Sequence, residues 1–146
     1  MWMRVHLCRR LVQYRIFVNA DMSIYLAIAM GGSLGAMSRY WMVTTTHQWL
    51  GTGFPYGTLS VNLLGSIAMG FLSVLLLERF HLSDEVRLGL LVGFLGSFTT
   101  FSTFAIDVLQ LGSNEEMMKT IVYIVLSVLL CIVGALGGLL AAKQMI

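Results

Sequence analysis

The sequence predicts an all-α membrane protein with four transmembrane helices, the third of them broken near its middle. Three observations lead to this prediction. The chain has 146 residues, of which 58% are hydrophobic and only 11% charged, whereas soluble domains carry about 25% charged residues. Four apolar stretches each have the ~20 residues needed to cross a hydrocarbon core. The third stretch interleaves glycine and hydroxyl residues with phenylalanines at its centre.

The N-terminal segment 1–21 differs from the rest of the chain, because it is basic and only modestly apolar. It lacks the uninterrupted apolar centre and the small-residue cleavage site of a signal peptide. We interpret it either as a leader added by an upstream start codon, with Met22 as the native first residue, or as a basic amphipathic surface helix. N-terminal sequencing distinguishes the two. Residues 22–146 form one four-helix transmembrane domain. The arginines of the segment are Arg4, Arg9, Arg10 and Arg15.

The four predicted spans contain almost no charge. The second and fourth have none, the first has Arg39 and the third has Asp107, each near the end of its span. The short connections hold the turn and charge signals, and four crossings place both termini on one side of the membrane. The spans are 24–43, 56–77, 88–108 and 120–142, and the connections are 51–55, 78–87 and 109–119.

Basic residues are distributed almost evenly between the two predicted sides of the membrane. Cytoplasmic loops normally carry an excess of Lys and Arg, so a near balance permits insertion in both orientations. Counting the segment 1–21 favours cytoplasmic termini. The side with the termini has Arg79, Arg87 and Lys143, and the other side has Lys119 and Arg39.

Glycines recur at four-residue spacing in three of the spans. Small residues at this spacing let helix backbones approach closely in lipid, where no hydrophobic force drives helices together. The pattern predicts a dense bundle. The pairs are Gly31 with Gly35, Gly89 with Gly93, and Gly134 with Gly138.

Polar side chains share one face of the second span and one face of the fourth. Polar atoms are costly inside a bilayer, so their placement indicates function. Hydrogen bonding between helices is the alternative explanation for such hydroxyls. Asn62 stands apart, because a carboxamide at this depth needs several partners. The two sets are Thr58, Asn62, Ser66 and Ser73, and Tyr123 and Ser127.

The centre of the third span, 93–104, predicts an interruption of the helix near 96–100. Glycine and repeated threonine weaken a helix, and unwound backbone survives in a membrane only where protein buries it or it lines a wet cavity. Such breaks offer carbonyls to a cation and N–H groups to an anion. Phe101 and Phe104 share a face, and ring edges are positive. A continuous helix with a polar face, and plain packing of the two rings, are the alternatives.

The cysteines and histidines do not form a recognisable metal or disulfide pattern. Cys8 and Cys131 are far apart, and Cys131 lies in an apolar run, so both are interpreted as ordinary thiols. The histidines His6, His47 and His81 are scattered. A formal net charge of +2 gives no indication of nucleic-acid binding.

Three segments together resemble the signature segments of the CrcB/Fluc fluoride channels. They are GGSLGAMSRY at 31–40, GTLSVNLLGS at 57–66 and GFLGSFTTFSTF at 93–104. The combination of the TTFSTF string with the upstream Val-Asn pair is highly specific. The resemblance covers the chain from about Met22 to its C-terminus.

The resemblance implies a small four-helix channel subunit that forms an antiparallel, dual-topology homodimer with two fluoride pores. It also implies a structural sodium ion at the dimer centre, held by main-chain oxygens of the third-helix break. The matching positions are Gly96 and Thr99. Where the family has a glycine pair, this chain has Gly96 followed by Ser97, which leaves the backbone less free. We expect the sodium site to remain.

The resemblance also assigns the fluoride pathway. Asn62 matches the family's pore asparagine, whose amide donates to the ion, and Phe101 with Phe104 match its phenylalanine pair. Arg39 matches an arginine at the end of the first helix, where it gives the vestibule a positive potential. The polar track matches Thr58, Tyr123 and Ser127, with Ser102 and Thr103 nearby.

The implied function is passive export of fluoride through the cell inner membrane, with fluoride, lipid and a second copy as partners. No side chain suits covalent chemistry, so an enzyme is rejected. One alternative is a small proton-coupled drug exporter, which needs an ionisable carboxylate at mid-membrane. Asp107 is placed at a helix end, which argues against this alternative. A structural helix-bundle subunit would explain the glycine pairs but not the broken span.

Overall fold

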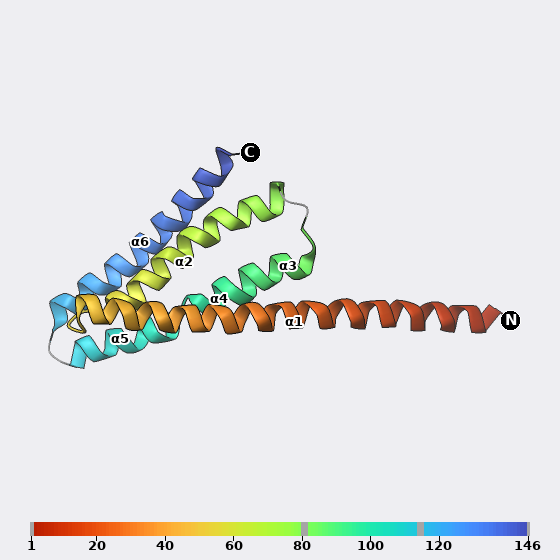
Figure 1. Cartoon of the computed structure of the whole chain (residues 1–146), viewed down its shortest axis with the longest axis horizontal. Coiled ribbons are helices and arrows are strands. Elements are labelled where there is room, and N and C mark those ends of the chain that lie inside the picture. Colours follow the sequence, from red (N-terminus) through yellow and green to blue (C-terminus); the bar gives the residue numbers. More distant parts are fainter. Residues whose placement is uncertain (1, 80–81, 114–115, 146) are drawn as a thin grey trace.

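The computed structural model describes the backbone of residues 2–79, 82–113 and 116–145 and the side chains of 22–77, 82–113 and 116–145, and within these residues all regular secondary structure is helical. Two segments, η1 and η2, are wound as π-helices, and the others are α-helical (Figure 1). In chain order the elements are α1 Trp2–Leu50, α2 Tyr56–Val74, η1 Leu75–Arg79, α3 Asp84–Leu88, η2 Gly89–Leu95, α4 Gly96–Phe98, α5 Phe101–Ser113 and α6 Met117–Lys143.

The helices form two packed pairs. α2 packs mainly against α6, and α1 packs mainly against η2 in the middle of the α3–α5 run. Figure 1 shows the ends of α1 and α5 close to the starts of α2 and α6 at one end of the bundle, while both termini point toward the other end. The turn from α1 to α2 uses Gly51 with a positive φ of 76°, a conformation that glycine adopts without a steric penalty.

Within the described part of the chain, three helical segments are long and apolar enough to cross a membrane: Tyr56–Leu77, Asp84–Ser113 and Met117–Lys143. They contain the second, third and fourth predicted spans. The first predicted span, 24–43, lies inside α1, but α1 is not among the three. Its three glycines, two serines and Arg39 lower the mean hydropathy of this stretch.

The predicted connection 109–119 is wrong in extent, because α5 continues to Ser113 and α6 already begins at Met117. The predicted connection 78–87 is also too long, since helix is present up to Arg79 and again from Asp84. Polar residues ended the apolar pattern in the sequence, but they are compatible with helix and extend it. Asp107 therefore lies within α5 and not at a helix end.

Residues 2–21 continue α1 as one unbroken helix (Figure 1). No change in the backbone marks the boundary predicted at residue 21. A non-native leader and a surface helix both stay predictions. Side chains that lie outside the described part of the chain include those of His6, Cys8, Arg79, His81 and the four N-terminal arginines.

The close helix contacts predicted from the glycine spacing are confirmed. A Cβ atom added at Gly138 would overlap the carbonyl oxygen of Ile67 in α2, and one added at Gly31 would overlap that of Gly89 in η2. The helix backbones are therefore in direct contact at these glycines, where a Cα hydrogen takes the place of a side chain. These contacts fix the positions of α2 and the α3–α5 run, on which the candidate site is built.

Candidate functional site

The α3–α5 run is interrupted between Phe98 and Phe101, within the range predicted from the sequence. Thr99 is extended, with φ −84° and ψ 159°. A continuing helix would pair the N–H of Thr100 with the carbonyl of Gly96. The turn at Thr99 prevents this, so the N–H of Thr100 needs another partner, whereas its carbonyl stands at the start of α5 and can accept the first bond of that helix.

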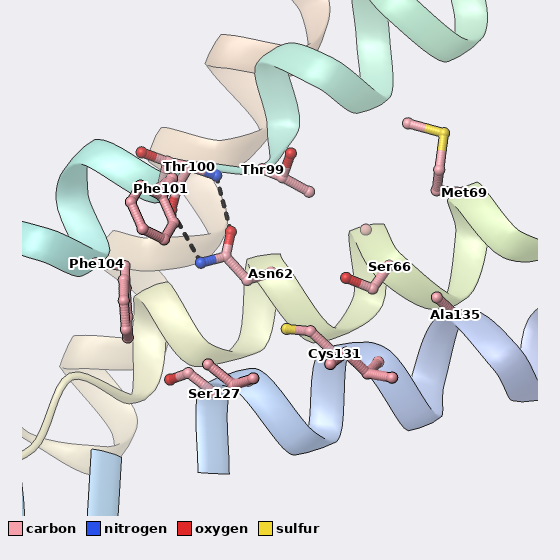
Figure 2. Close-up of a pocket in the computed structure, with 13 residues that line it drawn as sticks. Asn62, Ser66, Met69, Thr99, Thr100, Phe101, Phe104, Ser127, Cys131 and Ala135 are labelled. Atoms are coloured by element: carbon pink, nitrogen blue, oxygen red, sulfur yellow. Dashed lines mark hydrogen bonds between the residues drawn. The ribbon is translucent and has the colours of Figure 1, made fainter. Parts of the chain in front are cut away.

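Asn62 of α2 supplies that partner and also bonds the Thr100 carbonyl. Its Nδ2 donates to the Thr100 carbonyl at 2.9 Å, and the Thr100 N–H donates to its Oδ1 at 2.8 Å (Figure 2). The prediction that Asn62 requires several partners is confirmed. One N–H of its amide remains after these two bonds. The side chain thus holds the interruption in place and has one amide hydrogen outside these two bonds.

Thr100 also caps the helix that follows the interruption. Its Oγ1 accepts a hydrogen bond from the N–H of Thr103 at 3.2 Å, which satisfies one of the free N–H groups at the start of α5. The same hydroxyl bonds Oγ1 of Thr103 at 3.0 Å and Oγ of Ser102 at 3.2 Å. Two predicted pathway residues, Ser102 and Thr103, are therefore engaged in the cap.

A pocket of about 410 Å³ lies between α2, the interruption and α6 (Figure 2). None of the described residues that line it carries a charge. Ser127 of α6 is buried, and its Oγ has no hydrogen-bond partner within the described part of the chain. The polar, thiol and aromatic side chains that line it include Asn62, Phe101, Phe104, Ser127 and Cys131.

Aromatic contacts connect this pocket to Tyr123 on α6. The ring centroids of Phe101 and Phe104 are 5.4 Å apart, and those of Phe104 and Tyr123 are 5.3 Å apart. Tyr123 is fully buried, and the Thr58 and Ser127 side chains lie beside its hydroxyl. The structure thus brings together the predicted residues of the second and fourth spans.

The Tyr123 hydroxyl donates to Oδ2 of Asp107 at 3.1 Å. Asp107 in turn lines a second, polar pocket of about 560 Å³ together with His47, Glu116 and Lys119. In that pocket Lys119 Nζ and Glu116 Oε1 form an ion pair at 2.5 Å. Polar groups therefore continue from the first pocket through Tyr123 to the second.

Arg39 lies beside the interruption, whereas the resemblance implied a position at the end of the first helix. Its Nη1 is 3.4 Å from the Thr99 carbonyl oxygen, and α1 continues beyond it to Leu50. The helix continues beyond the predicted span 24–43 because the mostly polar residues 44–50 still fit a helix. Its guanidinium thus contacts one of the two oxygens predicted to hold sodium.

A family model described as CrcB-like protein, Camphor Resistance (CrcB), matches residues 26–139. The chain belongs to the CrcB family. It is a multi-pass membrane protein. The match begins after the basic segment 1–21 and includes every residue of the candidate site.

Three relatives of this CrcB chain are each named Fluoride-specific ion channel FluC. The one from Geobacter sulfurreducens is 40% identical over 124 residues, which cover 85% of this chain and 100% of the relative. The one from Hahella chejuensis is 42% identical over 112 residues, 77% of this chain and 88% of the relative. The one from Methylococcus capsulatus is 44% identical over 119 residues, which cover 82% of this chain but only 52% of that longer relative.

The CrcB site includes two residues that sequence reasoning did not select. Asp107 follows Phe104 by three positions, as Phe104 follows Phe101, so the same helical spacing could have placed it on their face. Thr100 was part of the predicted break, but its capping role depends on where α5 restarts. No spacing in the sequence gives that point.

Proposed function

We propose that this CrcB chain is a subunit of a fluoride-selective channel through which fluoride leaves the cell passively across the inner membrane. The names of its relatives support fluoride as the ion. Conduction needs no covalent chemistry, so the proposed function is not enzymatic. A negative-inside membrane potential drives an anion outward by ~2.3 kcal/mol per charge for each 100 mV.

The observation that carries this proposal is the uncharged pocket beside the interruption. A small anion that enters it must exchange water for other hydrogen-bond donors. The remaining N–H of Asn62 and the unpartnered Ser127 hydroxyl can donate. The positive edges of Phe101 and Phe104 add weak attraction. Weak, neutral donors let an ion leave again, whereas a lysine or arginine in the pocket would trap it.

In the proposed path, fluoride moves from this pocket along Thr58, Tyr123 and Ser127 toward the polar pocket at Asp107. The Tyr123 hydroxyl gives its hydrogen to Asp107, so in passing the ion competes with the carboxylate for that donor. Exposed Ser102 and Thr103 lie at the edge of the path. Arg39, beside the interruption, attracts anions to it.

We further propose that two copies assemble in antiparallel orientation, with the interruption at mid-membrane, two fluoride pores and one sodium ion between the copies. The oxygens of Gly96 and Thr99 fit such an ion in kind, although the Thr99 carbonyl also accepts a hydrogen bond from Arg39. The Gly96 carbonyl does not receive the Thr100 N–H, and Thr99 lies outside regular helix. Neutral main-chain oxygens suit a hard cation. When bound, sodium would offset the repulsion between carbonyl dipoles that face each other.

Fluoride efflux from proteoliposomes, followed with a fluoride electrode, tests the function. A potassium ionophore lets K⁺ leave the vesicles together with the anion, so that no opposing membrane potential builds up. Under these conditions we expect rapid efflux of fluoride and no comparable efflux of chloride. Ser113→Ala, which alters an exposed hydroxyl that bonds its own helix, is the matched control and should conduct like wild type. Absence of fluoride efflux from correctly assembled protein would refute the proposal. Replacing sodium with a large organic cation should lower efflux if the sodium site is real.

One structural observation favours the drug-exporter alternative: Asp107 lies within α5 and not at a helix end. An exporter would couple substrate to protons through this carboxylate, so a pH gradient alone would drive transport. The same vesicles separate the two mechanisms. A channel is supported if the rate of fluoride efflux depends on the membrane potential and does not change when a pH gradient is imposed.

A further inference from the structure

We infer that Cys131 is a modification site inside the ion pathway, where a small thiol-directed electrophile closes the channel. This inference rests on the proposed function. Sequence reasoning treated Cys131 as an ordinary thiol. The structure instead gives it a place in the wall of the pocket that contains Asn62 and Ser127.

The position of Cys131 follows from its register on α6. Tyr123, Ser127 and Cys131 are spaced by four residues, so they lie on one stripe of the helix. The first two are buried toward α2 and α5, and Cys131 is half-buried one turn further along, with a free thiol. Figure 2 shows its sulfur directed toward the space between α2 and α6, near Asn62 and Ser127.

A second observation supports a ligand site in this part of the pocket. Ser127, one turn before Cys131, has a buried hydroxyl that lies beside the Tyr123 hydroxyl but forms no hydrogen bond of normal geometry within the described residues, although buried polar groups are nearly always hydrogen-bonded. The ligand that would pair with it in the proposed path is fluoride. An ion that reaches Ser127 Oγ passes along the same wall as the Cys131 thiol.

The chemistry of the thiol makes the site sensitive to modification. A thiol is only a weak hydrogen-bond donor, so it contributes little to holding a small anion, but it is the nucleophile among the residues of this wall. With methyl methanethiosulfonate, the Cys131 sulfur attacks the sulfenyl sulfur of the reagent. A disulfide to a methylthio group forms, methanesulfinate leaves with the electron pair of the broken S–S bond, and the thiol proton passes to water. The added group fills space that the ion needs.

The reagent suits this site because it is small and uncharged. It can reach the pocket through the lipid or through either mouth of the pathway, so labelling does not depend on which side is open. The chain has two cysteines, and Cys8→Ser removes the other one. Comparing Cys8→Ser with the double variant Cys8→Ser/Cys131→Ser therefore isolates the Cys131 thiol.

The test measures fluoride efflux from proteoliposomes before and after treatment with methyl methanethiosulfonate. We expect Cys8→Ser to lose about tenfold or more of its efflux, equivalent to a barrier higher by ~1.4 kcal/mol. Dithiothreitol should restore it. The double variant should conduct before treatment, because serine keeps a donor at the position, and should be unaffected by the reagent. Size-exclusion chromatography checks that assembly is unchanged.

Mass spectrometry of the treated protein measures what fraction of Cys131 carries the methylthio group, so that unchanged efflux can be compared with the extent of labelling. Complete labelling of Cys131 with unchanged efflux would overturn the inference, and so would a thiol that the reagent cannot reach. If the untreated protein carries no fluoride at all, the proposed function fails. That result is distinct, because it appears before any reagent is added.

Discussion

The contact between α2 and α6 differs from the interruption between α4 and α5 in how the backbone is stabilised. The first is a contact between regular helices, and the second is a stretch of unwound backbone. At the first, helix backbones meet directly through glycines such as Gly70 and Gly138. At the second, the backbone is unwound and its peptide groups bond a side chain, Asn62. α2 takes part in both.

The difference teaches how a membrane helix bundle can contain an irregular site. Lipid offers no hydrogen bonds, so unwound backbone must be satisfied by protein. The amide that does so must be held in place, and lipid provides no hydrophobic force to hold it. Close glycine packing fixes α2, and α2 then presents Asn62 to Thr100. The glycine contact between α2 and α6 is therefore needed for the contact between Asn62 and the unwound backbone.

The largest effect is expected from Asn62→Leu, which removes the polar partner but keeps a side chain branched at Cγ. Both bonds to Thr100 are lost and its N–H is left without a partner, which costs about 1–3 kcal/mol for a buried group. The proposed path also loses its amide donor. We expect fluoride efflux to fall by about two orders of magnitude, as for a barrier raised by ~2.7 kcal/mol, in protein that still assembles.

Ser73→Ala is the matched control for that experiment. It alters another polar residue of α2, whose hydroxyl bonds the Gly70 carbonyl in its own helix, and it should conduct normally. Wild-type efflux from Asn62→Leu would show that neither the bonds to Thr100 nor the amide donor is required for conduction.

The next effect tests the regular contact. In Gly138→Ala the new Cβ would overlap the Ile67 carbonyl oxygen, so α2 and α6 must separate. Overpacking of this kind costs about 1–3 kcal/mol, and the melting temperature in detergent should fall. Gly137→Ala makes the same chemical change with open space around the new Cβ. It should leave the melting temperature unchanged or raise it, since alanine favours helix. Equal losses in both variants would contradict the packing argument.

These two regions also differ in how far the sequence predicts them. The contact follows from glycines at four-residue spacing, a local pattern that the structure confirms at Gly31 and Gly138. The interruption was also predictable, because glycine and threonine weaken a helix within one short stretch. Helix ends were less accessible. α5 extends to Ser113 through polar residues that end an apolar pattern without ending a helix.

The partners of the site residues could not be predicted, because they come from contacts between distant segments. Asn62 and Thr100 are 38 positions apart, and Arg39 and Thr99 are 60 apart. No periodicity encodes such pairs. The resemblance to a known family selected most residues of the site, but it did not indicate that Asp107 bonds Tyr123.

A smaller effect is expected from Tyr123→Phe, which keeps the ring between its aromatic neighbours and removes only the hydroxyl. Asp107 loses a hydrogen bond of about 0.5–1.5 kcal/mol, and the proposed path loses a donor. Efflux should fall by about threefold to tenfold, which corresponds to a similar change in the barrier. Asp107→Asn removes the charge but keeps an acceptor for the Tyr123 hydroxyl, so it separates the two contributions. An increase in efflux in Asp107→Asn alone would mean that the carboxylate chiefly repels the ion.

The smallest effect is expected from the Thr100 side chain, because its removal leaves the bonds between Asn62 and the peptide groups of residue 100 in place. Thr100→Val removes the hydroxyl that caps α5 through the N–H of Thr103, and a lost cap costs ~1 kcal/mol. The bonds to Asn62 use the peptide groups of residue 100, which valine retains. The melting temperature should therefore fall slightly while efflux stays close to wild type, and Thr100→Ser should restore stability. If Thr100→Val instead abolished efflux as fully as Asn62→Leu, the helix cap and the bonds from Asn62 would have to act as one unit. The distinction between these two contributions would then be wrong.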